Sequence, residues 1–387
     1  MNYIPYAKHE LSNNDFLLVK EALDSDMLTN GKFVGLFEGE LSKITNSKYV
    51  CACSNGTTAL HLAVWALGIA PGDFVVIPSL TFSATANTVI HVGGDIIFAD
   101  VDVETGLMTA ATIEEAILNF AKTNDVQKIK AIVNVHYAGQ CENLKDIWEL
   151  AQKYNLKIIE DAAHAIGSFY LDGKNEYAVG SNAFSDITTF SFHPTKTITT
   201  GEGGAVTTNN SEYAKKIKLL GSHAMERTDF ENPELSYPGY YEIQQLGHNF
   251  RISDINCALG IGQLKKLDKF IEKRRSIVKL YDSLFAESRT ITPLKNSIHS
   301  KAARHLYVVF MDFSGIGRNN FMNKMKEEGV GTQVYYCPIH MHPFYYHKYG
   351  KISLKNTEAF FSRCLSIPLF TQLTEKEVMF VTRALMA

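Results

Sequence analysis

The chain has 387 residues, 45% hydrophobic and 20% charged, and its 38 Lys and Arg residues against 41 Asp and Glu residues leave a net charge of −3. This composition is typical of a folded globular protein and excludes a disordered or collagen-like chain, and the length favours two domains. Because there is no basic excess to neutralise phosphates, nucleic acid is not an expected partner.

The start of the chain shows no sign of a targeting segment. No charged stretch followed by an apolar one occurs in the first residues, MNYIPYAKHELSNN. No apolar run reaches the roughly 18 residues of a membrane helix, so we expect a cytoplasmic protein without membrane contacts. The six cysteines are scattered without a repeated C-x-x-C spacing, which predicts buried free thiols and no metal site.

Short apolar runs alternate with amphipathic stretches between residues 48 and 208. This rhythm is typical of βαβ units, and runs that are apolar on both faces suit a mostly parallel sheet covered by helices. The fold class is therefore α/β, with ligands expected at the carboxyl ends of the strands. The predicted strands are YVCAC (49–53), FVVIPS (74–79), DIIFADV (95–101), KAIVNVHY (130–137), KIIEDAA (157–163), ITTFSF (187–192) and GAVTTN (204–209).

The pattern changes after Arg251. Residues 253–288 are predicted to form one nearly continuous helix, since no proline occurs until Pro293. Beyond it, two strands are predicted, HLYVVFMDF (305–313) and GVGTQVYYCPI (329–339), with an amphipathic helix over 319–329 between them. We therefore predict a large domain over 1–252, followed over 253–387 by a linking helix and a small α+β domain.

A small turn containing a glycine, Ser54-Asn55-Gly56-Thr57-Thr58, joins the first strand to a helical stretch. The free N–H groups and the positive dipole end of that helix, with two threonine hydroxyls, suit a phosphate. Ser, Asn and Thr are also ordinary N-caps, so the segment alone fits plain capping as well.

An acid and an imidazole follow the buried strand that begins at Lys157, in the segment Glu160-Asp161-Ala162-Ala163-His164. An acid at this place faces the expected ligand crevice. On this segment alone, Asp161 as a helix cap with His164 packed beside it is an equally good interpretation.

Lys196 lies just past another buried strand and before a turn rich in Gly and Thr. Desolvation there would lower the pKa of its amine and make it nucleophilic, whereas an isolated loop lysine is usually solvated. Taken together, the turn at 54–58, Asp161 and Lys196 are the parts that pyridoxal phosphate requires. That cofactor needs a lysine for its aldehyde, a carboxylate for its pyridine nitrogen and an anion site for its phosphate.

These motifs, in this order, resemble the DegT/DnrJ/EryC1/StrS family of sugar aminotransferases. The resemblance covers nearly the whole chain, including DMLTNG (26–31), PSLTFSATAN (78–87) and LGHNFR (246–251). It implies the type I PLP-dependent aminotransferase fold, with a mostly parallel central sheet, a large PLP-binding domain and a smaller C-terminal α+β domain. It also implies pyridoxal 5′-phosphate held covalently on Lys196 in the resting form.

The resemblance implies a role for each matching residue. Lys196 would be the Schiff-base lysine and general acid/base, and Asp161 the partner of the pyridinium nitrogen. In this family a residue matching Asn249 reaches the phosphate from the other subunit, which implies a homodimer with shared active sites. Contacts to the cofactor ring would come from Phe82 and His164, and contacts to its phosphate from Gly56, Thr57 and Ser191. An aromatic side chain such as that of Phe82 is also commonly a core residue.

Within the family, the chain is similar to the subgroup that acts in pseudaminic acid biosynthesis, for example in ALGIGQLKK (258–266) and QVYYCP (333–338). This similarity implies transfer of an amino group from L-glutamate to C4 of a UDP-linked 4-keto-6-deoxy-N-acetyl-hexosamine. The product would be UDP-4-amino-4,6-dideoxy-N-acetyl-β-L-altrosamine. The residues implied at the sugar-nucleotide site are Tyr6, Asp26, Met27, Leu28, Thr29, Gln333, Val334, Tyr335 and Tyr336, and only one of the two adjacent tyrosines would face the ligand if they lie on a strand.

Alternatives stay open at this point. Gly56-Thr57-Thr58 stands where the subgroup often has Ala-Thr-Ser, so the same chemistry on a bacillosamine-type UDP sugar or on the GDP-perosamine precursor is an alternative. A regulatory protein that kept the fold without catalysis is another. A nicotinamide dehydrogenase is disfavoured, since no G-x-G-x-x-G opens a helix with an acid about 20 residues later.

Overall fold

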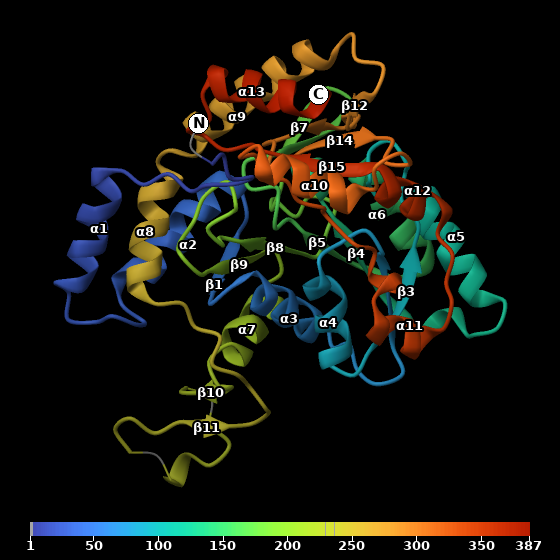
Figure 1. Ribbon diagram of the computed structural model, residues 1–387. Coiled ribbons are helices and arrows are strands. Elements are labelled where there is room, and N and C mark those ends of the chain that lie inside the picture. The colour runs from blue at the N-terminus through green and yellow to red at the C-terminus, as the bar shows by residue number, and fades with distance from the viewer. Residues whose placement is uncertain (1–2, 229, 236) are drawn as a thin grey trace.

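The computed structural model of the chain describes residues 3–228, 230–235 and 237–387. A seven-stranded sheet forms its central layer, with helices on both faces (Figure 1). Its strands are β1 (Tyr49–Cys53), β2 (Phe74–Pro78), β3 (Asp95–Ala99), β4 (Ile129–Val135), β5 (Lys157–Asp161), β8 (Ile187–Ser191) and β9 (Gly204–Thr208).

The strand order in this sheet is β1-β9-β8-β5-β4-β2-β3. Strands β8, β5, β4, β2 and β3 run parallel to one another, whereas β9 runs antiparallel to both β8 and β1. All seven strands predicted from the sequence form, with ends that agree to within two residues. The prediction of a mostly parallel α/β sheet is confirmed.

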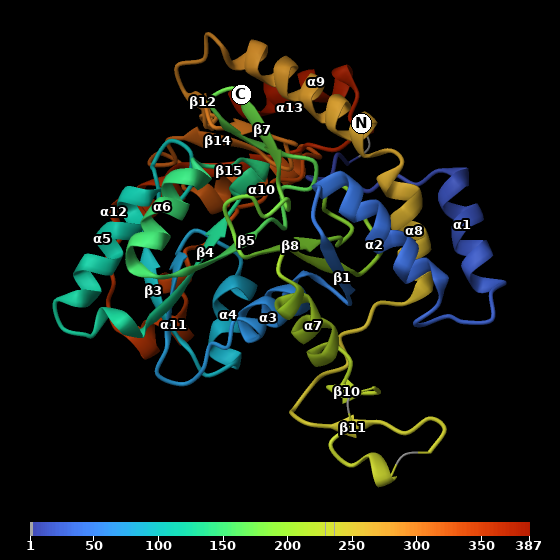
Figure 2. The same ribbon diagram turned by 180° about the vertical axis from the view of Figure 1, so that it is seen from behind.

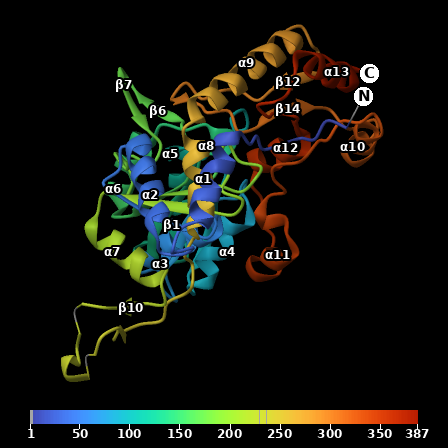
Figure 3. The same cartoon turned by 90° about the vertical axis from the view of Figure 1, so that its left-hand side faces the viewer.

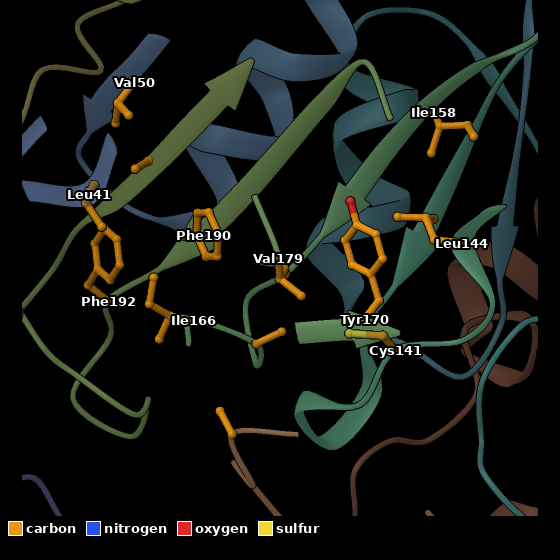
Figure 4. Packing of buried hydrophobic residues seen from close by; sticks show 14 of the residues in the cluster. Leu41, Val50, Cys141, Leu144, Ile158, Ile166, Tyr170, Val179, Phe190 and Phe192 are labelled. Atoms are coloured by element: carbon orange, nitrogen blue, oxygen red, sulfur yellow. The ribbon is translucent and has the colours of Figure 1, made fainter. Parts of the chain in front are cut away.

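Alternation along the strands builds one apolar core on each face of the sheet. Val75 and Ile77 of β2 pack into the core on one face, and Val76 between them packs into the other. The first core holds helices α3 (Gly56–Ala66), α4 (Ser83–His91) and α7 (Ser211–Leu220). The second core, shown in Figure 4, holds α2 (Lys32–Thr45), α5 (Ala110–Ala121), α6 (Leu144–Tyr154) and α8 (Asp254–Leu264).

A smaller antiparallel sheet follows in the C-terminal part of the chain. It has the order β12 (Ile291–Pro293), β14 (Tyr307–Met311) and β15 (Cys364–Ile367), and shares a core with α9 (Leu267–Phe285) and α13 (Glu375–Met386). Ile4 pairs with Val330, so the N-terminal residues lie beside this sheet, and both termini are found there (Figure 3). The division into domains at residue 252 stays a prediction.

Two predicted elements differ from the structure. The helix expected over 253–288 is interrupted by a turn at Lys265 and Lys266 between α8 and α9, where the ammonium of Lys266 binds Asp15. The strand expected over 329–339 forms only isolated bridges, since its residues pair with two different segments, Val330 with Ile4 and Gln333 with Ser366. The helix predicted between them forms as α10 (Arg318–Glu327).

A hairpin arm, made of residues 222–228, 230–235 and 237–250, projects from the body of the molecule (Figures 1 and 2). Among the described residues, no helix has the length and apolar character needed to cross a bilayer. The six cysteines are free thiols, five of them buried and Cys337 half-buried, as predicted. The remaining elements are α1 (Asn13–Leu23), β6 (Phe169–Asp172), β7 (Asn175–Ala178), β10 (Met225–Glu226), β11 (Glu242–Ile243), β13 (Ser300–Lys301), α11 (Pro343–Tyr349), α12 (Lys355–Arg363), and the short 3-10 helices η1 (Val126–Lys128), η2 (Tyr137–Gly139), η3 (Pro233–Leu235) and η4 (Ile339–Met341).

Candidate active site

A cavity of about 720 Å³ opens at the carboxyl ends of the central parallel strands. Val135 at the end of β4, Asp161 at the end of β5 and Ser191 at the end of β8 all line it. This is the edge at which open α/β sheets bind their ligands. Of the residues predicted for the site, the cavity is lined by Tyr6, Gly56, Thr57, Phe82, Asp161, His164, Ser191, Lys196, Tyr335 and Tyr336.

The N-terminus of α3 forms one end of the cavity. Asn55 caps the helix, since its Oδ1 accepts from the backbone N–H of Thr58 at 2.9 Å, while Thr58 Oγ1 accepts from the N–H of Asn55 at 3.1 Å. The first N–H groups of a helix have no acceptor within it, so those of Gly56 and Thr57 are available to an anion. A Cβ atom on residue 56 would lie 2.7 Å from Cβ of Ser191, so only glycine allows this approach. Capping and anion binding are therefore compatible here.

Asp161 is 5% exposed and its carboxylate is held by two hydrogen bonds. Thr85 Oγ1 on α4 donates to Oδ2 at 2.7 Å, and the N–H of Ala163 donates to Oδ1 at 3.2 Å. These bonds fix the orientation of an acid that lines the cavity. Thr85 was not singled out in the sequence, although it lies inside the segment PSLTFSATAN.

A buried polar pair lies behind Asp161. His136 Nε2 is 2.7 Å from Glu160 Oε2, both side chains are fully buried, and Thr188 Oγ1 donates to the other carboxylate oxygen at 2.9 Å. Burial alone would lower the pKa of His136, but Cys141 and Glu160 outweigh it and raise that pKa to about 10. The N–H of His136 donates to the carbonyl of Asp161 at 3.0 Å, so this pair anchors the strand end that carries the acid.

Lys196 is half-buried in the wall of the cavity. Its N–H donates to the carbonyl of His193 at 2.8 Å, which closes the turn after β8. Burial lowers the pKa of Lys196 to about 8, although the negative charge of Asp161 acts in the opposite direction. A lysine with this pKa supplies a substantial fraction of neutral, nucleophilic amine near pH 7 to 8. Its place in the cavity is not that of a solvated loop lysine.

Two imidazoles in contact with each other adjoin the lysine, their planes tilted by 39°. His164 lines the cavity, and the ring of His305 lies behind it with centroids 4.4 Å apart. Burial lowers the pKa of both side chains well below the ordinary 6.5, and the charge of Lys196 lowers both further. Both rings are therefore neutral. His305 was missed in the sequence because it lies at the start of HLYVVFMDF, where only a strand signal was evident.

Aromatic side chains form the outer wall of the cavity. Phe82 is 56% exposed and lies 5.9 Å from the ring of Tyr336, so it opens into the cavity and is not a core residue. The ring of Tyr6 lies 6.1 Å from that of Tyr335. Both adjacent tyrosines line the cavity, because the segment that carries them is not a regular strand.

The other predicted site residues lie outside this cavity. Asp26, Met27, Leu28 and Thr29 are exposed between α1 and α2, and Asn249 is exposed at the base of the hairpin arm. Gln333 and Val334 precede the cavity tyrosines, and Gln333 exchanges backbone hydrogen bonds with Ser366. A single chain therefore assembles the predicted cofactor residues other than Asn249, but only part of the predicted sugar-nucleotide site.

The sequence matches the DegT/DnrJ/EryC1/StrS aminotransferase family over residues 9–386. The chain belongs to this family. It is 37% identical to a UDP-4-amino-4,6-dideoxy-N-acetyl-beta-L-altrosamine transaminase of Campylobacter jejuni, over 98% of this chain and 95% of that protein. The structure of PseC from Helicobacter pylori, an aminotransferase involved in pseudaminic acid biosynthesis, superposes with a TM-score of 0.88 at 30% identity and covers 100% of this chain and 98% of PseC.

A third relative bears on the cofactor. The putative sugar aminotransferase Spr1654 of Streptococcus pneumoniae, solved in a PLP form, has a TM-score of 0.87 at 26% identity, with coverage of 99% of this chain and 97% of that one. The type I aminotransferase fold and the aminotransferase class are thus confirmed, and the dehydrogenase alternative is wrong. Membership of this family implies pyridoxal phosphate, and the residues present fit it: an anion cradle at Gly56, a fixed carboxylate at Asp161 and an amine at Lys196.

The reaction of Lys196 with pyridoxal phosphate should depend on pH with a midpoint near 8. The neutral amine is the reacting form, and its fraction grows as the pH rises through the pKa, which burial lowers from 10.5 to about 8. Stopped-flow absorbance of the apoprotein mixed with the cofactor, from pH 6 to 10.5, measures this rate. A rate that keeps rising tenfold per pH unit up to pH 10 would contradict the shifted pKa.

Gly56→Ala should weaken cofactor binding, the folded state, or both. The added methyl group collides with Ser191, and overpacking of this kind costs about 1–3 kcal/mol. The affinity for pyridoxal phosphate and the melting temperature are the two measurements. Gly35→Ala is the matched control, because a Cβ atom at that exposed position of α2 meets nothing within 4 Å. Equal behaviour of the two variants would show that the close approach at Gly56 is unimportant.

Proposed function

We propose that this enzyme transfers the amino group of L-glutamate to C4 of a UDP-linked 4-keto-6-deoxy-N-acetyl-hexosamine. The product is UDP-4-amino-4,6-dideoxy-N-acetyl-β-L-altrosamine. The observation that carries the chemistry is the placement of Lys196, Asp161 and the N-terminus of α3 around one cavity. The choice of sugar rests on the similarity to the Campylobacter jejuni transaminase and to PseC.

Each residue of the cavity has its own role in the proposed reaction. Lys196 would hold pyridoxal phosphate covalently in the resting enzyme, and its amine, once released, would accept the proton of the glutamate α-carbon and later supply a proton to C4 of the sugar. Asp161 keeps a proton on the pyridine nitrogen. When bound, the cofactor acts as an electron sink. The phosphate is held by Gly56, Thr57 and Ser191, and the ring by Phe82 and His164.

We place the sugar nucleotide against the aromatic wall. Tyr6, Tyr335 and Tyr336 offer apolar faces and hydroxyl groups, which suit a 6-deoxy sugar with few charged groups. Gln333 and Val334 extend this wall. The exposed stretch from Asp26 to Thr29 completes the site from a second copy of the chain.

A homodimer with shared active sites would explain why the predicted site residues Asp26 to Thr29 and Asn249 are exposed in the single chain. Large apolar side chains of the hairpin arm face solvent in the single chain, with Leu246 84% exposed, and contiguous exposed apolar surface marks an interface. Asn249 at the base of this arm reaches the cofactor phosphate of the other subunit. Subunits carrying Lys196→Ala mixed with subunits carrying Asn249→Ala should recover activity, since one of the two sites in a mixed dimer is then intact. No recovery after verified mixing would contradict shared sites.

The first test is the visible absorption spectrum of the protein with pyridoxal phosphate, before and after L-glutamate. A yellow band that bleaches on adding glutamate supports the cofactor, the lysine linkage and the amino donor together. A band that persists would favour another donor or the regulatory alternative. The bleached enzyme is then mixed with three 4-keto sugars: the proposed UDP sugar, the UDP sugar of the bacillosamine pathway and the GDP-perosamine precursor. Amination of only one of the latter two would overturn the proposed substrate.

A further inference from the structure

Within the described ranges, the hydroxyl of Tyr336 is the only cavity hydroxyl that forms a hydrogen bond with either of the two imidazoles, His164 and His305. It lies 2.9 Å from Nε2 of His164, and the planes of the two rings are nearly parallel, at 18°. His305 covers His164 from behind, at 4.4 Å, and does not line the cavity. Tyr336, His164 and His305 thus form a row that runs from the cavity into the protein.

The hydrogen-bond partners of His164 determine which group donates in its hydrogen bond with Tyr336. A neutral imidazole carries one N–H donor and one acceptor nitrogen. Nδ1 of His164 is buried and has no hydrogen-bond partner among the described residues, and the same holds for Nδ1 of His305. Because a buried unpaired N–H is rarer and costlier than an unpaired lone pair, the proton of His164 belongs on Nε2. His164 then donates to the oxygen of Tyr336.

This assignment leaves the hydroxyl hydrogen of Tyr336 free. A hydroxyl that accepts one hydrogen bond still has its own O–H to donate, and in the described part of the chain no second partner of this hydroxyl is found. The ring lines the cavity, so the O–H is available to a ligand there. The neighbouring Tyr335 differs, because it lies beside Tyr6 and has no hydrogen bond to His164 within the described residues.

We infer that Tyr336, oriented by His164 and by His305 as a positioning residue, donates a hydrogen bond to a ligand oxygen in the active-site cavity. Two oxygens share the required chemistry: the C4 carbonyl oxygen of the acceptor sugar and the phenolic oxygen of the cofactor. A donor at either oxygen stabilises negative charge that develops there. The inference rests on the proposed function for the identity of these ligands, and it goes beyond a general place of Tyr336 in the sugar-nucleotide site by assigning the donor, the orienting imidazoles and the two candidate acceptor oxygens.

The pKa shifts in this row indicate that the Tyr336 hydroxyl acts as a hydrogen-bond donor and not as a base. Burial raises the pKa of Tyr336 well above 10, and the nearby Tyr335 and Asp161 raise it further. The phenol therefore keeps its proton throughout the working pH range. Burial also keeps His164 and His305 uncharged, so His164 does not exchange its acceptor and donor roles by protonation.

The test compares Tyr336→Phe with Tyr349→Phe, which removes a hydroxyl that donates to Asp95 at 3.0 Å and does not line the cavity. Three quantities are measured: the pH midpoint of the cofactor's visible band, the rate of bleaching by L-glutamate and the rate at which the keto sugar restores the band. A contact with the sugar predicts a loss of about 100-fold in the last rate alone for Tyr336→Phe. A contact with the cofactor instead predicts a shift of about one pH unit in the midpoint. Wild-type values for all three, or equal effects in Tyr349→Phe, would overturn the inference.

His305 is tested through its coupling to Tyr336. If His305→Ala acts by disorienting His164, it should reproduce part of the Tyr336→Phe effect, and it should have no further effect in the double variant. A purely structural role predicts that the two effects add. If the wild-type enzyme neither binds pyridoxal phosphate nor responds to glutamate, the proposed function fails. If the wild-type enzyme passes both tests and Tyr336→Phe has wild-type values for all three quantities, this inference alone fails.

Discussion

Replacing Lys196 by alanine is expected to abolish the yellow band and to lower turnover by about 10⁴-fold or more. The variant loses both the nucleophile that holds the cofactor aldehyde and the base that moves the proton. The polar side chains around the cavity should stay in place, because among the residues that the structure describes Lys196 makes a hydrogen bond only through its backbone, to His193. The spectrum with pyridoxal phosphate and the rate with saturating glutamate and keto sugar are the measurements.

Lys196→Arg is the matched control for this variant. Arginine keeps a positive charge at the same place, but it is never deprotonated in a protein and cannot attack the aldehyde. It should therefore be as inactive as alanine, while the affinity for the anionic cofactor falls less. Normal turnover in either variant would contradict the role proposed for Lys196.

The positions of Asp161 and Lys196 in one cavity could be predicted from the sequence because each lies at or just beyond the end of a strand. Asp161 and Lys196 are 35 positions apart in the chain (196 − 161), and the hydrophobic pattern placed both at carboxyl ends. In the structure, β5 and β8 are neighbouring parallel strands, which brings the two side chains to one edge of the sheet. Local pattern and sheet topology together were enough for this part of the site.

The groups that hold these residues in place were not predictable in the same way. Thr85 and His305 lie 76 and 141 positions from their partners Asp161 and His164 (161 − 85 and 305 − 164), on elements whose sequence showed only a helix or a strand. Nothing in a hydrophobic pattern states which side chain of one element meets which side chain of another. Such contacts follow only from tertiary packing.

The two misassigned elements have related causes. The stretch 253–288 is helical by propensity throughout, but the ion pair of Lys266 with Asp15 stabilises a break that no local signal marks. The stretch 329–339 has the composition of a strand, yet it pairs first with Ile4 and then with Ser366. Its departure from a regular strand is what allows Tyr335 and Tyr336 to line the same cavity.

Asp161→Asn should retain cofactor binding and lower turnover by about 10²- to 10³-fold, the scale expected when one preorganised charge at the reacting centre is lost. Asparagine has the same shape and still accepts the hydrogen bond of Thr85, but it has no negative charge to keep the pyridine nitrogen protonated. The yellow band should therefore form at nearly normal cofactor concentration, since Lys196 and the phosphate cradle at Gly56 are unchanged. Most of the loss in turnover should appear as a slower rate of bleaching by glutamate.

Thr85→Val separates the charge of Asp161 from its orientation. The variant keeps the carboxylate and removes the 2.7 Å hydrogen bond to Oδ2, together with the 2.8 Å contact between the hydroxyls of Thr85 and Thr81, so we expect a loss of about tenfold, smaller than for the asparagine variant. If Asp161→Asn bleaches with glutamate at the wild-type rate, the carboxylate does not act on the pyridine nitrogen. If Thr85→Val is as slow as Asp161→Asn, the orientation of the carboxylate, held from α4, matters as much as its charge.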